Sequence, residues 1–385
     1  METPPLPAPE GLPEEPPSPR LDVHTVAVLA TLAVFTLFLV TGVLVSPLNV
    51  PFGLWFTEVF VFGGLGWFVL RATHREPVDY TGLRFPGLAP AAFGLLLGVV
   101  NFFAVVVPLQ YLSQSLLPKS WQDIYDVASL FRGQSLVELV LIVAGVSIAA
   151  PLFEEFFFRG LFLRGLMAPG GAPTRAVVIS AVVFSAFHLD PIGFLARVEL
   201  GLLFGLLFVR TGSLWPCLLA HAANNAVSTV LYFTARELES PQDVSTQTEV
   251  LSVLGLSAIG LLALGGLLSA TRSYPSLLGN SPLSRAPQPP VPLQPFPRLV
   301  RLALPWVVGA LLVLQGYISL DTRGIQVSQV DQRHPLRALP EDAPEELQAE
   351  RERLYQLRVQ ARRGEVPLER YAEERERQTH SHPSR

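Results

Sequence analysis

The stretch "LVELVLIVAGVSIAAPLFEEFFFRG", Leu136–Gly160, decides the fold class. Up to Phe153 the run is almost entirely apolar, and it is long enough to cross a bilayer core, which needs ~20 helical residues. Three ionisable side chains then follow close together: Glu154, Glu155 and Arg159. Ionisable groups inside a membrane are costly and by default indicate a functional site. The stretch therefore predicts a membrane helix that carries a polar site.

Composition extends this prediction to most of the chain. Half of the 385 residues are hydrophobic and only 16% are charged, whereas a soluble domain carries about 25% charged residues. The mean hydropathy is +0.39. We expect an all-α fold, a polytopic transmembrane helical bundle of about eight or nine spans. The predicted spans are 23–45, 52–71, 88–112, 136–166, 175–190, 193–211, 215–234, 250–270 and 302–320.

Composition also divides the chain into five parts. A Pro-rich acidic segment of residues 1–21 is predicted to be a disordered tail, and residues 22–271 form the membrane domain. A Pro-rich linker of residues 272–300 precedes an additional transmembrane helix, 301–320. The remainder, 321–385, is a charged tail that is predicted to be helical.

Arginine placement predicts the orientation in the membrane. If the N-terminus is cytoplasmic, one side of the bundle holds most of the arginines, as the positive-inside rule requires. They include Arg71, Arg75, Arg84, Arg164, Arg175, Arg210, Arg272 and Arg298. Nine spans would then place the charged tail on the opposite side. Lys119 is the only lysine, and this arginine bias favours a GC-rich bacterial source, hence the bacterial inner membrane.

The charged tail carries a second pattern. From Glu341, apolar residues such as Leu354 and Leu357 recur at near-helical spacing among charges, and "RRGEVPLERY" predicts a turn before a second helix. The segment resembles the small helical hairpin called the short C-terminal (SHOCT-type) domain. A solvated charged helix is the alternative interpretation.

Polar residues occur in three of the predicted spans. Glu155 and Arg159 are four residues apart, so they share a helical face and can pair. Glu154 is rotated by about 100° from Glu155 and must point elsewhere. The "FSAFH" stretch ends at His188, and "HAANN" runs from His221 to Asn225. Counting residues along a straight helix puts His188 near the outer end of a short span. A tilted span, or a helix that starts deeper in the membrane, is needed to bring it to Glu154.

These side chains form a set that could hydrolyse a peptide bond. A carboxylate at Glu154 suits a general base that activates water, and His188 could hold the same water. Donors on His221 and Asn225 could stabilise a tetrahedral oxyanion. A second interpretation stays open, because Glu154, His188 and His221 also form a two-His, one-carboxylate set of the kind that binds catalytic zinc. The HExxH signature of the zincins is absent. Cys217 is read as a small buried hydrophobe.

The three motifs, EExxxR, FxxxH and HxxxN in this order, resemble the CAAX-protease and bacteriocin-processing (CPBP, also called Abi) family. These intramembrane endopeptidases are related to the type II CAAX prenyl endopeptidase. The resemblance implies that Glu154 is the catalytic glutamate, that His188 helps to activate water, and that His221 and Asn225 form the oxyanion site. It gives Glu155 and Arg159 a supporting role and makes residues 22–271 a CPBP-like protease domain.

We therefore expect an intramembrane endopeptidase that cleaves near the C-terminus of, or within, a membrane-associated protein or peptide. A non-catalytic scaffold or bacteriocin-immunity-type binding protein is the alternative. A proton-coupled transporter would also explain the buried polar groups but predicts an internal repeat, which this sequence lacks. The expected partners are the lipid bilayer and the substrate, with no nucleic acid. Zinc is the cofactor to test.

Overall fold

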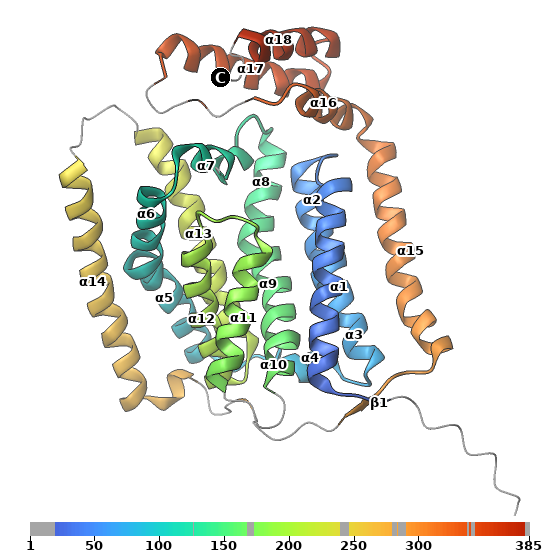
Figure 1. The fold of residues 1–385 in the computed structure, drawn as a ribbon, viewed down its shortest axis with the longest axis vertical. Helices are drawn as coiled ribbons and strands as arrows, with labels where there is room; N and C mark the ends of the chain where they lie inside the picture. Colours follow the sequence, from blue (N-terminus) through green and yellow to red (C-terminus); the bar gives the residue numbers. More distant parts are fainter. Residues whose placement is uncertain are drawn as a thin grey trace, which may run out of the picture.

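The computed structural model describes residues 20–125, 127–167, 173–238, 246–278, 283, 290–336, 339 and 343–381. Within these residues the fold is all-α apart from a short antiparallel strand pair, β1 (Arg20–Leu21) and β2 (Val291–Pro292). The predicted fold class is thus confirmed (Figure 1). Most of the disordered tail predicted for residues 1–21 lies outside the described residues.

The first half of the bundle consists of one single helix and three long helical segments that contain π-helical turns. The turns interrupt otherwise α-helical backbone, as they often do at functional sites. The segments are α1 (Val23–Leu44); α2 (Val50–Phe56), η1 (Thr57–Leu65) and α3 (Gly66–Ala72); α5 (Leu88–Asn101), η2 (Phe102–Val106) and α6 (Val107–Leu116); and α8 (Leu136–Ala144), η4 (Gly145–Ala149), α9 (Ala150–Glu155), η5 (Phe156–Leu163) and α10 (Arg164–Leu166).

Shorter elements connect the long helices in both halves of the bundle. The connecting elements are α4 (Pro77–Thr81), α7 (Lys119–Ile124), η3 (Val127–Leu130) and η6 (Pro275–Leu278). The long helices of the second half are α11 (Pro173–Phe187), α12 (Phe194–Thr211), α13 (Leu214–Leu238), α14 (Thr246–Ser273) and α15 (Phe296–Leu320). The end of α14 and the beginning of α15 thus lie within the predicted linker, 272–300.

Six helical segments among the described residues are long and apolar enough to cross a membrane: Val23–Leu44, Val50–Ala72, Leu88–Leu116, Leu136–Leu166, Val250–Ser273 and Phe296–Leu320. The chain is therefore an integral multi-pass membrane protein. Three of the nine predicted spans correspond to α11, α12 and α13, which are not among the six. The first is short, the second carries Arg197, Glu199 and Arg210, and polar side chains lower the hydropathy of α13.

The two ends of the bundle differ. The end that holds β1, β2 and the start of α15, here called the basic end, also carries Arg71, Arg164 and Arg210. From there α15 runs along one edge of the bundle to the opposite end, where three helices form a small C-terminal domain (Figure 1). These are α16 (Thr322–Arg333), α17 (Glu345–Arg363) and α18 (Leu368–Ser381).

The C-terminal domain contacts the loops of the bundle through polar side chains. Gln332 Nε2 donates to the carbonyl of Pro47 at 2.6 Å, and Arg358 Nη1 donates to the carbonyl of Gly133 at 2.7 Å. Arg362 forms an ion pair with the buried Glu138 near the start of α8, at 2.9 Å. The domain thus covers the end of the bundle at which the Leu136–Leu166 segment begins.

Close backbone packing positions α13, the helix that carries the HxxxN motif. It lies against α5 at Gly98, where an added Cβ would stand 2.3 Å from the carbonyl oxygen of Ala220. Only glycine permits this approach, and His221 is the next residue along α13. Aromatic side chains, among them Phe158, Phe184 and Phe204, fill the core on the other side of the site.

Candidate active site

Glu155 lies at the centre of a buried polar cluster. Its Oε1 accepts a hydrogen bond from Arg159 Nη1 at 2.9 Å and lies 2.9 Å from His221 Nδ1. The side chains of Glu155 and Arg159 are fully buried. Helical spacing in the sequence predicts the Arg159 contact, while the His221 contact joins α9 to α13. Because a carboxylate only accepts, His221 must carry its proton on Nδ1.

Arg159 has polar and aromatic partners within the core. In addition to the Glu155 ion pair, its Nη2 donates to the carbonyl of Gly201 at 3.3 Å. Its guanidinium carbon lies 4.5 Å from the ring centroid of Phe184 and 5.2 Å from that of Phe204. Phe204 in turn stacks on the His221 ring at 4.9 Å. Cation–π contact and ion pairing thus fix one face of the site and orient His221.

Glu154 differs from Glu155 in its surroundings. It is 8% exposed, and its Oε2 has no hydrogen-bond partner in the described part of the chain. The imidazole of His221 is close by, with its Nε2 4.0 Å from Glu154 Oε2. This distance is too long for a direct hydrogen bond but allows one water molecule to contact both atoms. Glu154 is therefore a buried carboxylate that is free to bind a small polar ligand.

His188 lies at the edge of the site. It directly follows the last residue of α11, and its Nδ1 is 3.0 Å from the carbonyl of Phe184. A carbonyl only accepts, so His188 donates from Nδ1 and leaves Nε2 as an acceptor. Both His188 and His221 contact the Phe184 ring edge-on, at centroid distances of 5.1 and 5.8 Å. Unlike Glu154, His188 has an exposed side chain.

Asn225 uses part of its carboxamide to join two helices. Its Nδ2 donates to the carbonyl of Val146 at 2.9 Å, and its Oδ1 accepts from Asn224. Val146 belongs to a π-helical turn, in which each carbonyl would bond to the N–H five residues later. For Val146 that residue is Pro151, which has no N–H. Asn225 therefore satisfies the carbonyl that Pro151 leaves open, and its second Nδ2 hydrogen remains available.

The sequence analysis missed a further acidic residue, Glu58 in η1. It is 4% exposed, its charge interacts with that of Glu154, and its Oε2 lacks a partner among the described residues. Because Glu58 lies in a different segment from the three motifs, no spacing pattern connects it to them. The available signal was the presence of an ionisable residue within the apolar run "FTEVFVFGG".

The arrangement does not provide a ready zinc site. The described residues contain no group of three or more His, Cys, Asp or Glu side chains placed to hold one metal ion. His221 directs Nδ1 to Glu155, and His188 directs Nδ1 to a backbone carbonyl. The zinc ligand set of Glu154, His188 and His221 remains a prediction.

Comparison with protein families identifies the segment that carries the site. Residues 136–227 match the family described as type II CAAX prenyl endopeptidase Rce1-like. They span α8 to α13 and include Glu154, His188 and His221, whereas Glu58 lies outside the match. No curated protein and no solved structure matches the chain. The resemblance inferred from the three motifs is confirmed: residues 136–227 are similar to the type II CAAX prenyl endopeptidase family.

Proposed function

We propose that the chain is an intramembrane endopeptidase that hydrolyses a peptide bond of a membrane-associated protein or peptide. The observation that carries the proposal is the contrast between two adjacent carboxylates. Glu155 pairs with Arg159 and contacts His221 through Oε1, whereas Glu154 is buried without an ion pair to any arginine of the described residues, 4.0 Å from His221 Nε2. The similarity of residues 136–227 to a peptidase family supports a catalytic reading of this contrast.

The proposed reaction gives each of these groups one role. Glu154 takes one proton from a water molecule, and His188 Nε2 accepts a hydrogen bond from the O–H that remains. The resulting hydroxide attacks the peptide carbonyl carbon, and a tetrahedral oxyanion forms. Protonated Glu154 then passes its proton to the leaving amine as the C–N bond breaks. Glu154 thus acts first as general base and then as general acid.

Two groups are available to stabilise the oxyanion. The second Nδ2 hydrogen of Asn225 can donate, and an imidazolium form of His221 can donate from Nε2. The Glu155 carboxylate lies 2.9 Å from Nδ1 and orients the ring. Each such donor is worth about 10²–10³ in rate in characterised proteases.

The test compares wild type, Glu154→Ala and His188→Ala in membranes on a peptide panel that includes a prenylated CAAX-type peptide. We expect new cleavage products from wild type and none from the two variants. Glu199→Gln is the matched control, because this carboxylate already accepts a hydrogen bond from Asn101 at 2.8 Å. Identical products from all variants would refute the peptidase and favour the non-catalytic scaffold.

A chelator added to the same assay separates two mechanisms. Retained cleavage is expected for water activated by Glu154 alone. Loss of cleavage that zinc restores would instead support the metal-bound alternative with Glu154, His188 and His221 as ligands.

A further inference from the structure

A cavity of about 470 Å³ lies at the basic end of the bundle, between the end of α3 and the start of α15. Its charged lining comes from both elements and from the loop after α3: Arg71, Arg75, Glu76, Arg298 and Arg301. The volume is within the range of pockets that bind small molecules. The cavity is separate from the candidate active site, with which it shares no residue.

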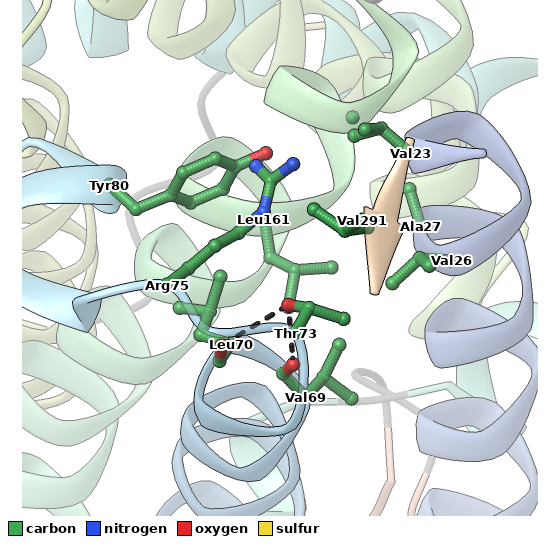
Figure 2. Close-up of a pocket in the computed structure, with 11 residues that line it drawn as sticks. Val23, Val26, Ala27, Val69, Leu70, Thr73, Arg75, Tyr80, Leu161 and Val291 are labelled. Carbon is green, nitrogen blue, oxygen red and sulfur yellow. Dashed lines mark hydrogen bonds between the residues drawn. The ribbon is translucent and has the colours of Figure 1, made fainter. Parts of the chain in front are cut away.

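The loop that forms one wall is held in place by local hydrogen bonds. Thr73 Oγ1 donates to the carbonyls of Val69 and Leu70 and closes the end of α3 (Figure 2). His74 adopts a left-handed backbone conformation, with φ of 55°. Gln294 then ties this loop to the segment before α15, because its Nε2 lies 2.9 Å from His74 Nδ1 and its N–H donates to the carbonyl of Ala72.

One of the arginines is oriented by an aromatic ring. The Arg75 guanidinium lies over the Tyr80 ring, 4.0 Å from its centroid (Figure 2). This cation–π contact holds the side chain at the boundary between the cavity and the small pocket that Figure 2 shows. The wall contributed by the α3 end is thus built before any ligand arrives.

The charge of the cavity is strongly unbalanced. Among the described residues, four guanidinium groups and one carboxylate line it, and this carboxylate, Glu76, is already paired with Arg71 at 2.5 Å. On α15, Arg298 contacts the Gln294 side chain and Arg301 contacts the carbonyl of Pro297, each at 3.4 Å. Neither contact supplies a negative charge. Guanidinium groups bind phosphate oxygens in a bidentate manner, so a phosphate is the complementary ligand.

The location of the cavity indicates the source of the phosphate. The cavity lies where one membrane segment, Val50–Ala72, ends and another, Phe296–Leu320, begins. Leu302 completes the lining, and exposed apolar side chains continue along α15, including Leu304, Val307 and Leu311. A molecule with its phosphate among the arginines could place its acyl chains along this helix. The positive-inside rule puts the basic end at the cytoplasmic leaflet, which carries anionic lipids.

We propose that this cavity binds the phosphate diester of an anionic phospholipid from the cytoplasmic leaflet. Orientation alone explains an excess of arginine at this end but not the convergence of four arginines on one cavity. Arg84 and Arg210 are at the same end and outside the cavity, and both are exposed. They serve as matched controls for a general charge effect.

The test uses the full chain in phosphatidylcholine nanodiscs, with and without phosphatidylglycerol. We expect phosphatidylglycerol to raise the unfolding temperature of wild type and to remain bound in native mass spectrometry. Arg298→Gln with Arg301→Gln should lose the rise and retain this lipid about tenfold less strongly, a difference of ~1.4 kcal/mol. The control pair, Arg84→Gln with Arg210→Gln, should behave as wild type.

Two results would overturn the proposal: no effect of phosphatidylglycerol on wild type, or equal losses in the cavity pair and the control pair. A further arm adds water-soluble glycerophosphoglycerol or inorganic phosphate to phosphatidylcholine discs. A rise as large as that with the lipid would assign the cavity to a soluble phosphate and refute the lipid. If the glutamine pair does not fold, Arg298→Lys with Arg301→Lys replaces it, and a reduced rise is expected because lysine lacks the planar fork.

Discussion

The membrane bundle and the C-terminal domain both bury charged side chains, but they satisfy them differently. In the C-terminal domain, Asp331 Oδ2 accepts from Arg358 Nε at 2.7 Å, and its Oδ1 accepts from the Tyr371 hydroxyl. Arg375 lies 3.3 Å from the same Oδ1. Both oxygens of the carboxylate are thus partnered, and the ions hold three helices together.

In the bundle, one oxygen on each of three buried carboxylates has no hydrogen-bond partner within the described residues: Glu58 Oε2, Glu154 Oε2 and Glu155 Oε2. An unsatisfied buried polar atom costs free energy that packing elsewhere must offset. The C-terminal domain shows that this chain can satisfy a carboxylate completely. We infer that charge in the C-terminal domain serves stability. In the bundle, Glu155 is held by Arg159, and Glu154 is the carboxylate left for a ligand or reaction.

The largest expected effect comes from Glu155→Gln. This change leaves the guanidinium of Arg159 fully buried without its counter-ion, which costs about 3–5 kcal/mol. Unfolding titrations in mixed detergent micelles would measure the loss. The control is Glu199→Gln, which removes a charge at a site bonded to Asn101. A loss for Glu155→Gln no larger than the control would show that the ion pair is not structural.

A smaller effect is expected for Asn225→Ala, and it should appear in catalysis. The change removes the donor to the Val146 carbonyl and, under the proposed mechanism, one oxyanion donor, so cleavage should slow about 10²–10³-fold. Rates on the best substrate of the peptide panel test this. Asn224→Ala is the neighbouring control, since its Nδ2 donates to Asn225. Equal slowing in both variants would argue against an oxyanion role.

A substitution in the C-terminal domain should lower the stability of that domain and leave peptide cleavage unchanged. Asp331→Asn removes the charge that binds Arg358 and Arg375, and we expect the domain to lose about 1–3 kcal/mol. Limited proteolysis between α16 and α18 would detect this loss, while peptide cleavage by the bundle should stay unchanged. A variant that keeps a stable domain but loses cleavage would place Asp331 in the functional machinery.

The smallest effect concerns alkaline pH. Burial, followed by the charge of Asp331, raises the pKa of Tyr371 above its ordinary value. The folded domain therefore keeps a proton that the unfolded chain releases above pH ~10. Stability from this group is complete below that pH and falls as the pH rises beyond it. Tyr371→Phe should flatten the pH dependence of domain unfolding, and an unchanged slope would contradict the assignment.

Sequence patterns anticipated the helical fold because long apolar runs allow few alternatives in a membrane. Helical spacing also anticipated the face shared by Glu155 and Arg159. By contrast, the contact of Glu155 with His221 joins residues 66 positions apart, and no local period encodes it. The approach of Glu58 to Glu154 depends in the same way on how η1 packs. Polar residues of the site lowered the hydropathy of α13, and charged residues outside the site did the same for α12.

The central claim is that Glu154 is kept unpartnered for chemistry and not for stability. Glu154→Gln tests it most directly, because the side chain keeps its shape and loses its charge and basicity. Cleavage of the best panel substrate and the unfolding temperature should be measured on the same preparation. We predict a cleavage rate reduced about 10²–10⁴-fold with an unfolding temperature equal to or above that of wild type. Cleavage at the wild-type rate, or a loss of cleavage that accompanies a lowered unfolding temperature, would contradict the claim.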